Sequence, residues 1–389
     1  MELERVPDIA KYLSAVFLLA WIGRSTVWNF LPIFFENNME SVFLVGVLTS
    51  LSAAVPIILD IPVGNLVQRA GEKVVIFMGI SLVILPPLMF YTALVPLFFA
   101  GKILEGVAKA FIWNGGWSLT LKSSDAETES ESVSIFLLGI NMAIVTGPVI
   151  GGYLIAGYGF GLPLMLWVLT SSLAVIAYYF AIGTEREKGL ESSLEDLTHS
   201  STYFNDFHHL KENWSNLRHE LVLIFLYSII FSFYWLAVPL LLDKMNADFA
   251  TMGLIFGFAA LPKMFQFVFG DIADRIGKHH TIRILAVLLI PTLFAMSMVE
   301  SLILTGLLFF LARVFSSGMS PAIHGIFDEN VPNEVEGEMT GFNELAKHTG
   351  QTIGPVFAGT VASIWSLNGS FIAAAGVAAL ILIISLLDF

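Results

Sequence analysis

Long apolar runs separated by short polar segments dominate the chain. Each run is about 20 residues or longer, the length that a helix needs to cross the hydrocarbon core of a bilayer. The runs fall near residues 12–35, 42–67, 74–95, 97–120, 133–157, 161–183, 221–243, 249–272, 281–299, 302–326, 340–365 and 368–388. The pattern predicts an all-α polytopic membrane protein with about twelve transmembrane helices.

One long hydrophilic stretch, residues 184–220, divides these runs into two sets of six. We interpret it as a cytoplasmic linker between an N-terminal bundle at residues 1–183 and a C-terminal bundle at residues 221–389. Large apolar residues recur within and just beyond its middle at spacings of three and four, namely Tyr203, Phe207, Leu210, Trp214 and Leu217. This spacing is typical of an amphipathic helix that lies on protein or on the membrane surface.

An internal repeat relates the two sets of runs. Three groups recur 206 or 207 residues later: Trp28 and Pro32 as Trp235 and Pro239; Gly64, Arg69 and Gly71 as Gly270, Arg275 and Gly277; Gly147 and Pro148 as Gly354 and Pro355. A near-constant offset over most of the chain predicts two similar halves in the same orientation, related by an axis along the membrane normal.

The composition agrees with a lipid environment and excludes several kinds of function. Hydrophobic residues make up 56% of the chain and charged residues only 13%, against roughly 25% charged in soluble proteins. The net charge of −13 argues against nucleic acid as a partner. The chain has no cysteine, no phosphate-binding loop and no His-Glu-x-x-His motif, so we expect no enzyme activity, no cofactor and no metal.

The distribution of Lys and Arg predicts the orientation in the membrane. Twelve of them fall on the side of the N-terminus: Arg5, Lys11, Arg69, Lys73, Lys122, Arg186, Lys188, Lys211, Arg218, Arg275, Lys278 and Arg283. Lys244 alone falls on the opposite side. The positive-inside rule then places both termini in the cytoplasm of a multi-pass protein of the cell membrane.

Two polar loops carry a recognisable motif. Residues 64–73 read Gly-Asn-Leu-Val-Gln-Arg-Ala-Gly-Glu-Lys, and residues 270–279 read Gly-Asp-Ile-Ala-Asp-Arg-Ile-Gly-Lys-His. Both resemble the loop signature G-x-L-x-D-R-x-G-R-K of the major facilitator superfamily, although Gln68 replaces the Asp in the first copy. The resemblance implies gating roles for Asp60, Gly64, Arg69, Gly71, Gly270, Asp274, Arg275 and Gly277. We expect the glycines to allow close helix packing and a tight turn, and Asp and Arg to pair across the cytoplasmic gate.

The fifth and eleventh runs carry a second motif. Gly147, Pro148, Gly151 and Gly152 are similar to the G-x-x-x-G-P-x-x-G-G antiporter signature, and Gly354 and Pro355 repeat part of it. Small residues let helices pack closely and proline interrupts the backbone ladder, which suits a hinge. The resemblance covers essentially the whole chain. It implies the family's fold, two pseudo-symmetric six-helix bundles, and transport by alternating access, with export favoured by the antiporter motif.

Charged residues within the apolar runs are candidates for the substrate site, because each costs several kcal/mol in a bilayer. The bases are Arg24, Lys102, Lys109, Lys263, Arg313 and Lys347, and the acids are Glu105, Glu344 and Asp60. Excess cations repel one another unless an anion enters, so we expect an anionic substrate. The structural alternative is that Lys102 pairs with Glu105, that Lys347 pairs with Glu344, and that Lys263 extends toward the interface or caps a carbonyl.

The family resemblance implies that the first, fourth, seventh and tenth spans line a central cavity. It adds the polar and aromatic candidates Trp28, Asn29, Trp113, Tyr234, Trp235 and His324 to the substrate site. For proton coupling, the candidates are Glu105, Glu344 and His348, because carboxylates and imidazoles carry protons in such cavities.

The sequence therefore predicts a monomeric secondary transporter that exchanges protons for a small organic anion or an anionic amphiphile. One alternative is a multidrug/proton antiporter for neutral or lipophilic compounds, since 33 Phe and 13 Met could line an adaptable cavity. From another class, a lipid scramblase or a membrane sensor that transports nothing stays open.

Overall fold

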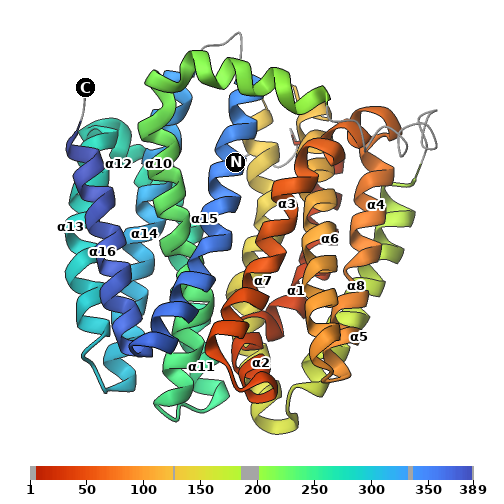
Figure 1. The fold of residues 1–389 in the computed structure, drawn as a ribbon. Coiled ribbons are helices and arrows are strands. Elements are labelled where there is room, and N and C mark those ends of the chain that lie inside the picture. The colour runs from red at the N-terminus through yellow and green to blue at the C-terminus, as the bar shows by residue number, and fades with distance from the viewer. Residues whose placement is uncertain (1–5, 126–127, 185–200, 332–335, 388–389) are drawn as a thin grey trace. The chain divides into compact units, whose positions relative to one another are not determined.

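The computed structural model describes residues 6–125, 128–184, 201–331 and 336–387, without the side chains of residues 130, 201–216 and 336–338. Within these residues the regular structure is helical, without any strand (Figure 1). The helices are α1 Asp8–Trp28, α2 Leu31–Met39, α3 Val42–Ala70, α4 Glu72–Leu82, α5 Leu85–Tyr91, α6 Val95–Lys122, α7 Glu129–Tyr158, α8 Gly161–Ala181, α10 Ser201–Lys244, α11 Phe249–Met264, α12 Gln266–Ile276, α13 Lys278–Met296, α14 Leu302–Asn330, α15 Glu336–Ile364 and α16 Leu367–Leu386.

These helices follow the predicted apolar runs closely. In the described part of the chain, eight helices are long and apolar enough to cross a membrane, and ten spans result if each of two bent pairs counts as one. The long helices α6 and α15, which carry several of the predicted intramembrane charges, complete a set that is consistent with the twelve predicted spans. The prediction of an all-α polytopic membrane protein is therefore confirmed.

Two of the spans are broken near their middle or end. α1 and α2 meet at an angle of 46°, and α11 and α12 meet at 44°. The second break follows Pro262, whose ring cannot donate the backbone hydrogen bond that a straight helix requires. The first break lies at Asn29 and Phe30, directly before a helix whose second residue is Pro32.

The chain forms two compact units. Unit 1 comprises Met1–Leu31, Val55–His199 and Phe249–Gly257, and unit 2 comprises Pro32–Ala54, Ser200–Asp248 and Phe258–Phe389. Two helices, α3 and α11, therefore contribute residues to both units. The linker boundaries at residues 184 and 220 stay a prediction; α10 is continuous from Ser201 to Lys244, and the predicted amphipathic side chains up to Trp214 lie outside the described residues.

The internal repeat extends to the packing of helices within each unit. In unit 1, a Cβ atom added to Gly147 of α7 would lie 2.3 Å from Cβ of Ser25 on α1. In unit 2, a Cβ added to Gly354 of α15 would lie 2.1 Å from Oγ of Ser232 on α10. Ser232 follows Ser25 by the same offset of 207 residues that separates the two glycines. The same small-residue contact therefore holds a helix pair together in both units.

Large apolar side chains cover the outside of the helices. Phe180 is 81% exposed, Ile303 87% and Ile364 81%. A soluble protein rarely leaves extended apolar surface in water, so lipid is the solvent that this exterior requires.

Candidate functional site

Unit 1 contains a buried ion triad formed by α1 and α6. The Arg24 guanidinium donates from Nε to Oε1 of Glu105 over 2.7 Å and also binds the same oxygen through Nη2. Lys102 donates from Nζ to Oε2 of Glu105 over 2.8 Å, one turn earlier on the same helix. Lys102 is 2% exposed and Glu105 5%, so both charges are removed from water. Both oxygens of the carboxylate are thereby bound by cations, which is what a buried ion pair requires.

This triad revises the charge argument drawn from the sequence. The sequence shows no acid close to Arg24 on its own helix, and α6 supplies Glu105. The alternative pairing of Lys102 with Glu105 is present as well. One carboxylate is shared by two bases, so the triad as a whole keeps one excess positive charge.

Aromatic rings surround the triad. The Cζ atom of Arg24 lies 4.9 Å from the ring centre of Trp28, a cation–π contact. Trp113, two turns beyond Glu105 on α6, packs edge-on against Trp21 with ring centroids 6.4 Å apart. Two other candidates in unit 1 are partly exposed: Lys109, on the same helix, and Asn29, which lies at the break after α1.

Unit 2 contains two cations around one aromatic ring. The Cζ atom of Arg313 on α14 lies 4.8 Å from the ring centre of Phe231 on α10, and the Nζ atom of Lys263 on α11 lies 6.0 Å from it. Among the described residues, neither side chain forms a hydrogen bond or an ion pair with a carboxylate. The positive charges of Arg313 and Lys347 also repel the positive charge of Lys263. We call Arg313, Lys263 and Phe231 the cation cluster.

Tyrosine and tryptophan side chains flank the cation cluster. Arg313 lies 5.8 Å from the ring centre of Tyr234, and the Tyr234 hydroxyl is buried. Trp235 packs edge-on against Phe231 with centroids 5.7 Å apart. Phe231 was missed in the sequence because it is not polar. Its position one turn before Trp235 would have placed it on the same face of the helix.

A second polar cluster in unit 2 lies along α15. Lys347 binds Glu344 in an ion pair, and Nε2 of His348 lies 3.5 Å from Oε2 of Glu344. His324 of α14 has its Nδ1 atom 3.4 Å from Nδ2 of Asn343, with a donor role that depends on its tautomer. Glu344 therefore contacts both the Lys347 ammonium and the His348 imidazole, which becomes a cation when it is protonated. Glu344 and His348 remain candidates for proton transfer.

The two copies of the loop motif end in similar turns. Gly71 has a φ of 89° and Gly277 a φ of 94°, a region that side chains with a Cβ rarely adopt. The tight turn expected of these glycines is therefore present. The close packing expected at Gly64 is absent, because nothing lies within 4 Å of an added Cβ there, and at Gly270 the nearest atom, Cβ of Pro321, is 3.8 Å away.

The charged residues of these motifs form local contacts. Asp60 accepts a hydrogen bond from Asn114 of α6 over 3.1 Å. Arg275 pairs with Asp271, one turn earlier on α12, over 2.8 Å. Asp271 lies at the helical spacing of four that favours such a pair, and the pairing of Asp and Arg across the cytoplasmic gate stays a prediction. Arg69 remains a predicted gating residue.

The antiporter-like motif of α7 makes close backbone contacts in unit 1. An added Cβ at Gly151 would lie 1.7 Å from the carbonyl oxygen of Thr26, and one at Gly152 would lie 2.3 Å from that of Phe249. Pro148 and Pro355 both lie inside their helices, α7 and α15. The glycines thus let α1 and the first part of α11 approach the α7 backbone, as the motif predicts.

No group of three or more His, Asp or Glu side chains that could hold a metal ion occurs among the described residues.

The chain belongs to the Major Facilitator Superfamily, whose family model matches residues 13–261 and 221–388. It is 22% identical over 385 residues to "Multidrug resistance protein MdtG" of Escherichia coli O6:K15:H31 (strain 536 / UPEC), an alignment that covers 92% of this chain and 91% of the relative. The protein is thus a membrane transporter of this family, and it is not an enzyme.

Two solved structures show the same fold. A bacterial homolog of the human lysosomal transporter Spinster, in an inward-facing and unoccupied conformation, matches with a TM-score of 0.79 and 12% identity, covering 97% of this chain and 96% of the other. The human organic anion transporter MFSD10 (TETRAN) matches with a TM-score of 0.69 and 15% identity, covering 97% and 98%. At these identities the likeness concerns the fold alone.

Proposed function

We propose that this transporter moves a small organic anion, or an amphiphile with an anionic head, by alternating access coupled to protons, in the direction of export. The observation that carries the proposal is the cation cluster of unit 2. Arg313 and Lys263 both lie against the ring of Phe231 and, in the described part of the chain, no carboxylate compensates them. A buried cation without an acidic partner is unfavourable, and a substrate carboxylate, sulfonate or phosphate relieves that cost on binding.

The chemistry of Arg313 favours a planar anion. A guanidinium offers two parallel N–H donors to a carboxylate or phosphate, whereas an ammonium acts as a point charge. The ring centres of Phe231 and Tyr234 lie 4.8 Å and 5.8 Å from Cζ of Arg313, and in the described residues the guanidinium binds no carboxylate. The buried hydroxyl of Tyr234 is a further group that a bound anion could engage.

The triad of unit 1 contributes to coupling in this proposal. Glu105 holds Arg24 and Lys102 while it is ionised. Glu105 is therefore a candidate to bind and release the exchanged proton, and Glu344 and His348 of unit 2 are the second pair of candidates for proton transfer.

A second candidate function, export of neutral or lipophilic compounds, is favoured by two observations. The relatives named MdtG are called multidrug resistance proteins, although at 22% identity. Rings also line α10 from Tyr227 to Trp235, with centroids of successive rings about 6 Å apart. Family membership favours either transporter over the scramblase or sensor that the sequence left open.

Transport by purified protein in proteoliposomes separates the two candidates. We expect a fluorescent carboxylate probe to be carried by the native protein, with competition from simple organic carboxylates and with movement of protons seen by a pH dye in the lumen. Arg313→Gln should weaken the apparent affinity for the carboxylate by about tenfold to a hundredfold, because a hydrogen bond to a charged group is worth about 1.5–3 kcal/mol.

The matched control is Lys11→Gln, which removes one positive charge from an exposed pair with Asp8. We expect it to transport like the native protein, and Arg313→Lys to lie between the two because the charge is kept and the fork is lost. Native affinity for the carboxylate in Arg313→Gln would refute the anion assignment. Export of a neutral dye by native protein and Arg313→Gln alike would establish the multidrug alternative.

A further inference from the structure

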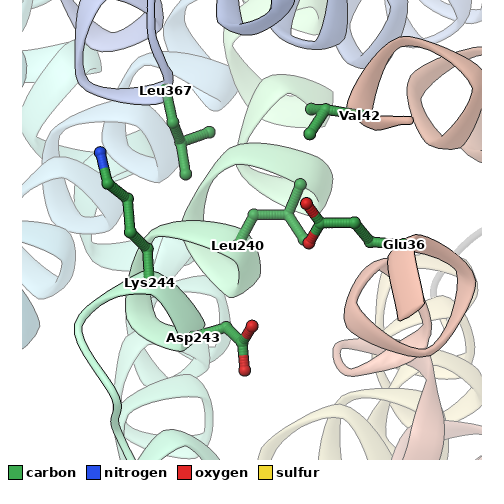
Figure 2. Close-up of a pocket in the computed structure, with 6 residues that line it drawn as sticks. All are labelled: Glu36, Val42, Leu240, Asp243, Lys244 and Leu367. Carbon is green, nitrogen blue, oxygen red and sulfur yellow. The ribbon is translucent and has the colours of Figure 1, made fainter. Parts of the chain in front are cut away.

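Unit 2 contains a pocket at the end of α10 that none of the candidate residues above explains. Its volume is about 360 Å³, and it is lined by Glu36, Val42, Leu240, Asp243, Lys244 and Leu367 (Figure 2). The lining comes from the C-terminal parts of α2 and α10 and from the starts of α3 and α16, and all six residues belong to unit 2. By the bias of Lys and Arg, this end of the unit is predicted to face the outside.

The two carboxylates of the pocket are related by the internal repeat. Asp243 follows Glu36 by 207 residues, the offset that also relates Trp28 to Trp235 and Pro32 to Pro239. Both acids stand one turn after the repeated proline, at equivalent positions of the first and the seventh span. Figure 2 shows their carboxylates turned into the same pocket from different helices. Their convergence is therefore a property of the duplicated fold.

Neither carboxylate is neutralised by a base in the described part of the chain. The side-chain carboxylates of Glu36 and Asp243 form no hydrogen bond or ion pair there, and the negative charge of Asp243 repels that of Glu36. Lys244 is the third charged residue of the lining, but its Nζ atom donates to Oδ1 of Asn368 over 3.2 Å. Leu240, Val42 and Leu367 are apolar, and α15, which packs on α3 through Gly359 near Val42, has no charged residue between positions 348 and 364.

Two carboxylates in a pocket of this kind repel each other when both are ionised, and sharing one proton removes the repulsion. We propose that Glu36 and Asp243 are a proton-sharing pair whose protonation keeps α2 against the end of α10 and whose deprotonation opens the pocket. One proton bridging the two carboxylates forms a hydrogen bond from one helix to the other. Its release leaves two like charges on α2 and α10, and the pocket widens to admit water.

This inference goes beyond the proposed function, since it concerns closure of one end of unit 2 and requires no particular substrate. The chain has no cysteine, so a single introduced cysteine reports on one place alone. We choose Val42→Cys as the reporter, because Val42 lines the pocket and cysteine is of similar size. Asn37→Cys, at an exposed position of α2, is the reference for the reactivity of a thiol in water.

The experiment measures the rate of maleimide labelling of the full chain in detergent micelles over a pH series that runs from acid to neutral, across which the shared carboxyl proton is released. Thiols themselves become more reactive as pH rises, so the quantity of interest is the rate at position 42 divided by the rate at position 37. We expect this ratio to rise several-fold with pH in the native background. In the Glu36→Gln/Asp243→Asn background, the ratio should stay at all pH values at the level that the native background shows at low pH.

The control for charge in the same pocket is Lys244→Gln, which should keep the pH dependence. Three results would overturn the proposal: a native ratio that does not change with pH, an unchanged pH dependence in the doubly neutral variant, or loss of the pH dependence in Lys244→Gln. None of these measurements depends on transport. A failure of the proposal for the carboxyl pair can therefore be distinguished from a failure of the proposal for an anionic substrate.

Discussion

Replacing Glu105 by glutamine removes the single acid of the unit 1 triad and leaves Arg24 and Lys102 without their partner. The carboxylate accepts from both bases, over 2.7 Å from Nε of Arg24 and over 2.8 Å from Lys102. Breaking a buried pair by removing one partner costs about 3–5 kcal/mol, because the remaining charge stays in a medium of low polarity. We expect Glu105→Gln to lower the free energy of unfolding by about that amount.

A compensating substitution tests the cause. Adding Lys102→Met to Glu105→Gln removes one of the two stranded cations and replaces it by an apolar side chain of similar length. About half of the lost free energy should return, since an apolar replacement of a buried ion is often neutral or stabilising. If Glu105→Gln instead destabilised the protein by altering helix packing, adding Lys102→Met would lower the free energy of unfolding further.

Unfolding in mixed detergent and dodecyl sulfate micelles, followed by tryptophan fluorescence, measures these differences. Trp21 and Trp113 lie 6.4 Å apart near the triad and report on its surroundings. Glu300→Gln, which neutralises an exposed acid, serves as the control and should change little. Native stability of Glu105→Gln, or a double variant less stable than the single one, would refute the reasoning about stranded charges.

The glycines allow two further tests by thermal unfolding in detergent. Gly151→Ala should lower the free energy of unfolding by about 1–3 kcal/mol, since the added Cβ would lie 1.7 Å from the carbonyl oxygen of Thr26, whereas Gly157→Ala, with nothing within 4 Å, should be neutral. A Gly151→Ala variant as stable as Gly157→Ala would contradict the close contact. Gly277→Ala should cost about 1–2 kcal/mol, because its φ of 94° strains a residue with a Cβ, and an unchanged midpoint would show that the turn adapts.

Much of the fold could be predicted from the sequence because the bilayer imposes one simple requirement. A span needs a long apolar helix, and the length of each apolar run then gives its place in the chain. The start of α10 shows where this reasoning ends. Residues 201–220 are polar, but they contain no Gly or Pro, and the helix continues through them from Ser201 into the span.

The charged site was harder to predict, because sequence spacing tells which residues share a helix face and not which helix lies opposite. Lys102 and Glu105 are three residues apart, and their pairing was foreseeable. Arg24 and Glu105 are separated by 81 residues, and only the packing of α1 near α6 brings them together. The cation cluster was found only in part, since its central ring, Phe231, carries no charge by which a sequence would single it out.

Helices α3 and α11 each contribute residues to both units, so the two halves of the sequence do not coincide with the two units. Pro32–Ala54 completes unit 2 although it precedes the linker, and Phe249–Gly257 completes unit 1 although it follows it. A nick within residues 185–200 would therefore give two fragments that each retain a segment of the other's fold. Each fragment would supply in trans a segment that packs with the unit of its counterpart, as in a domain-swapped pair.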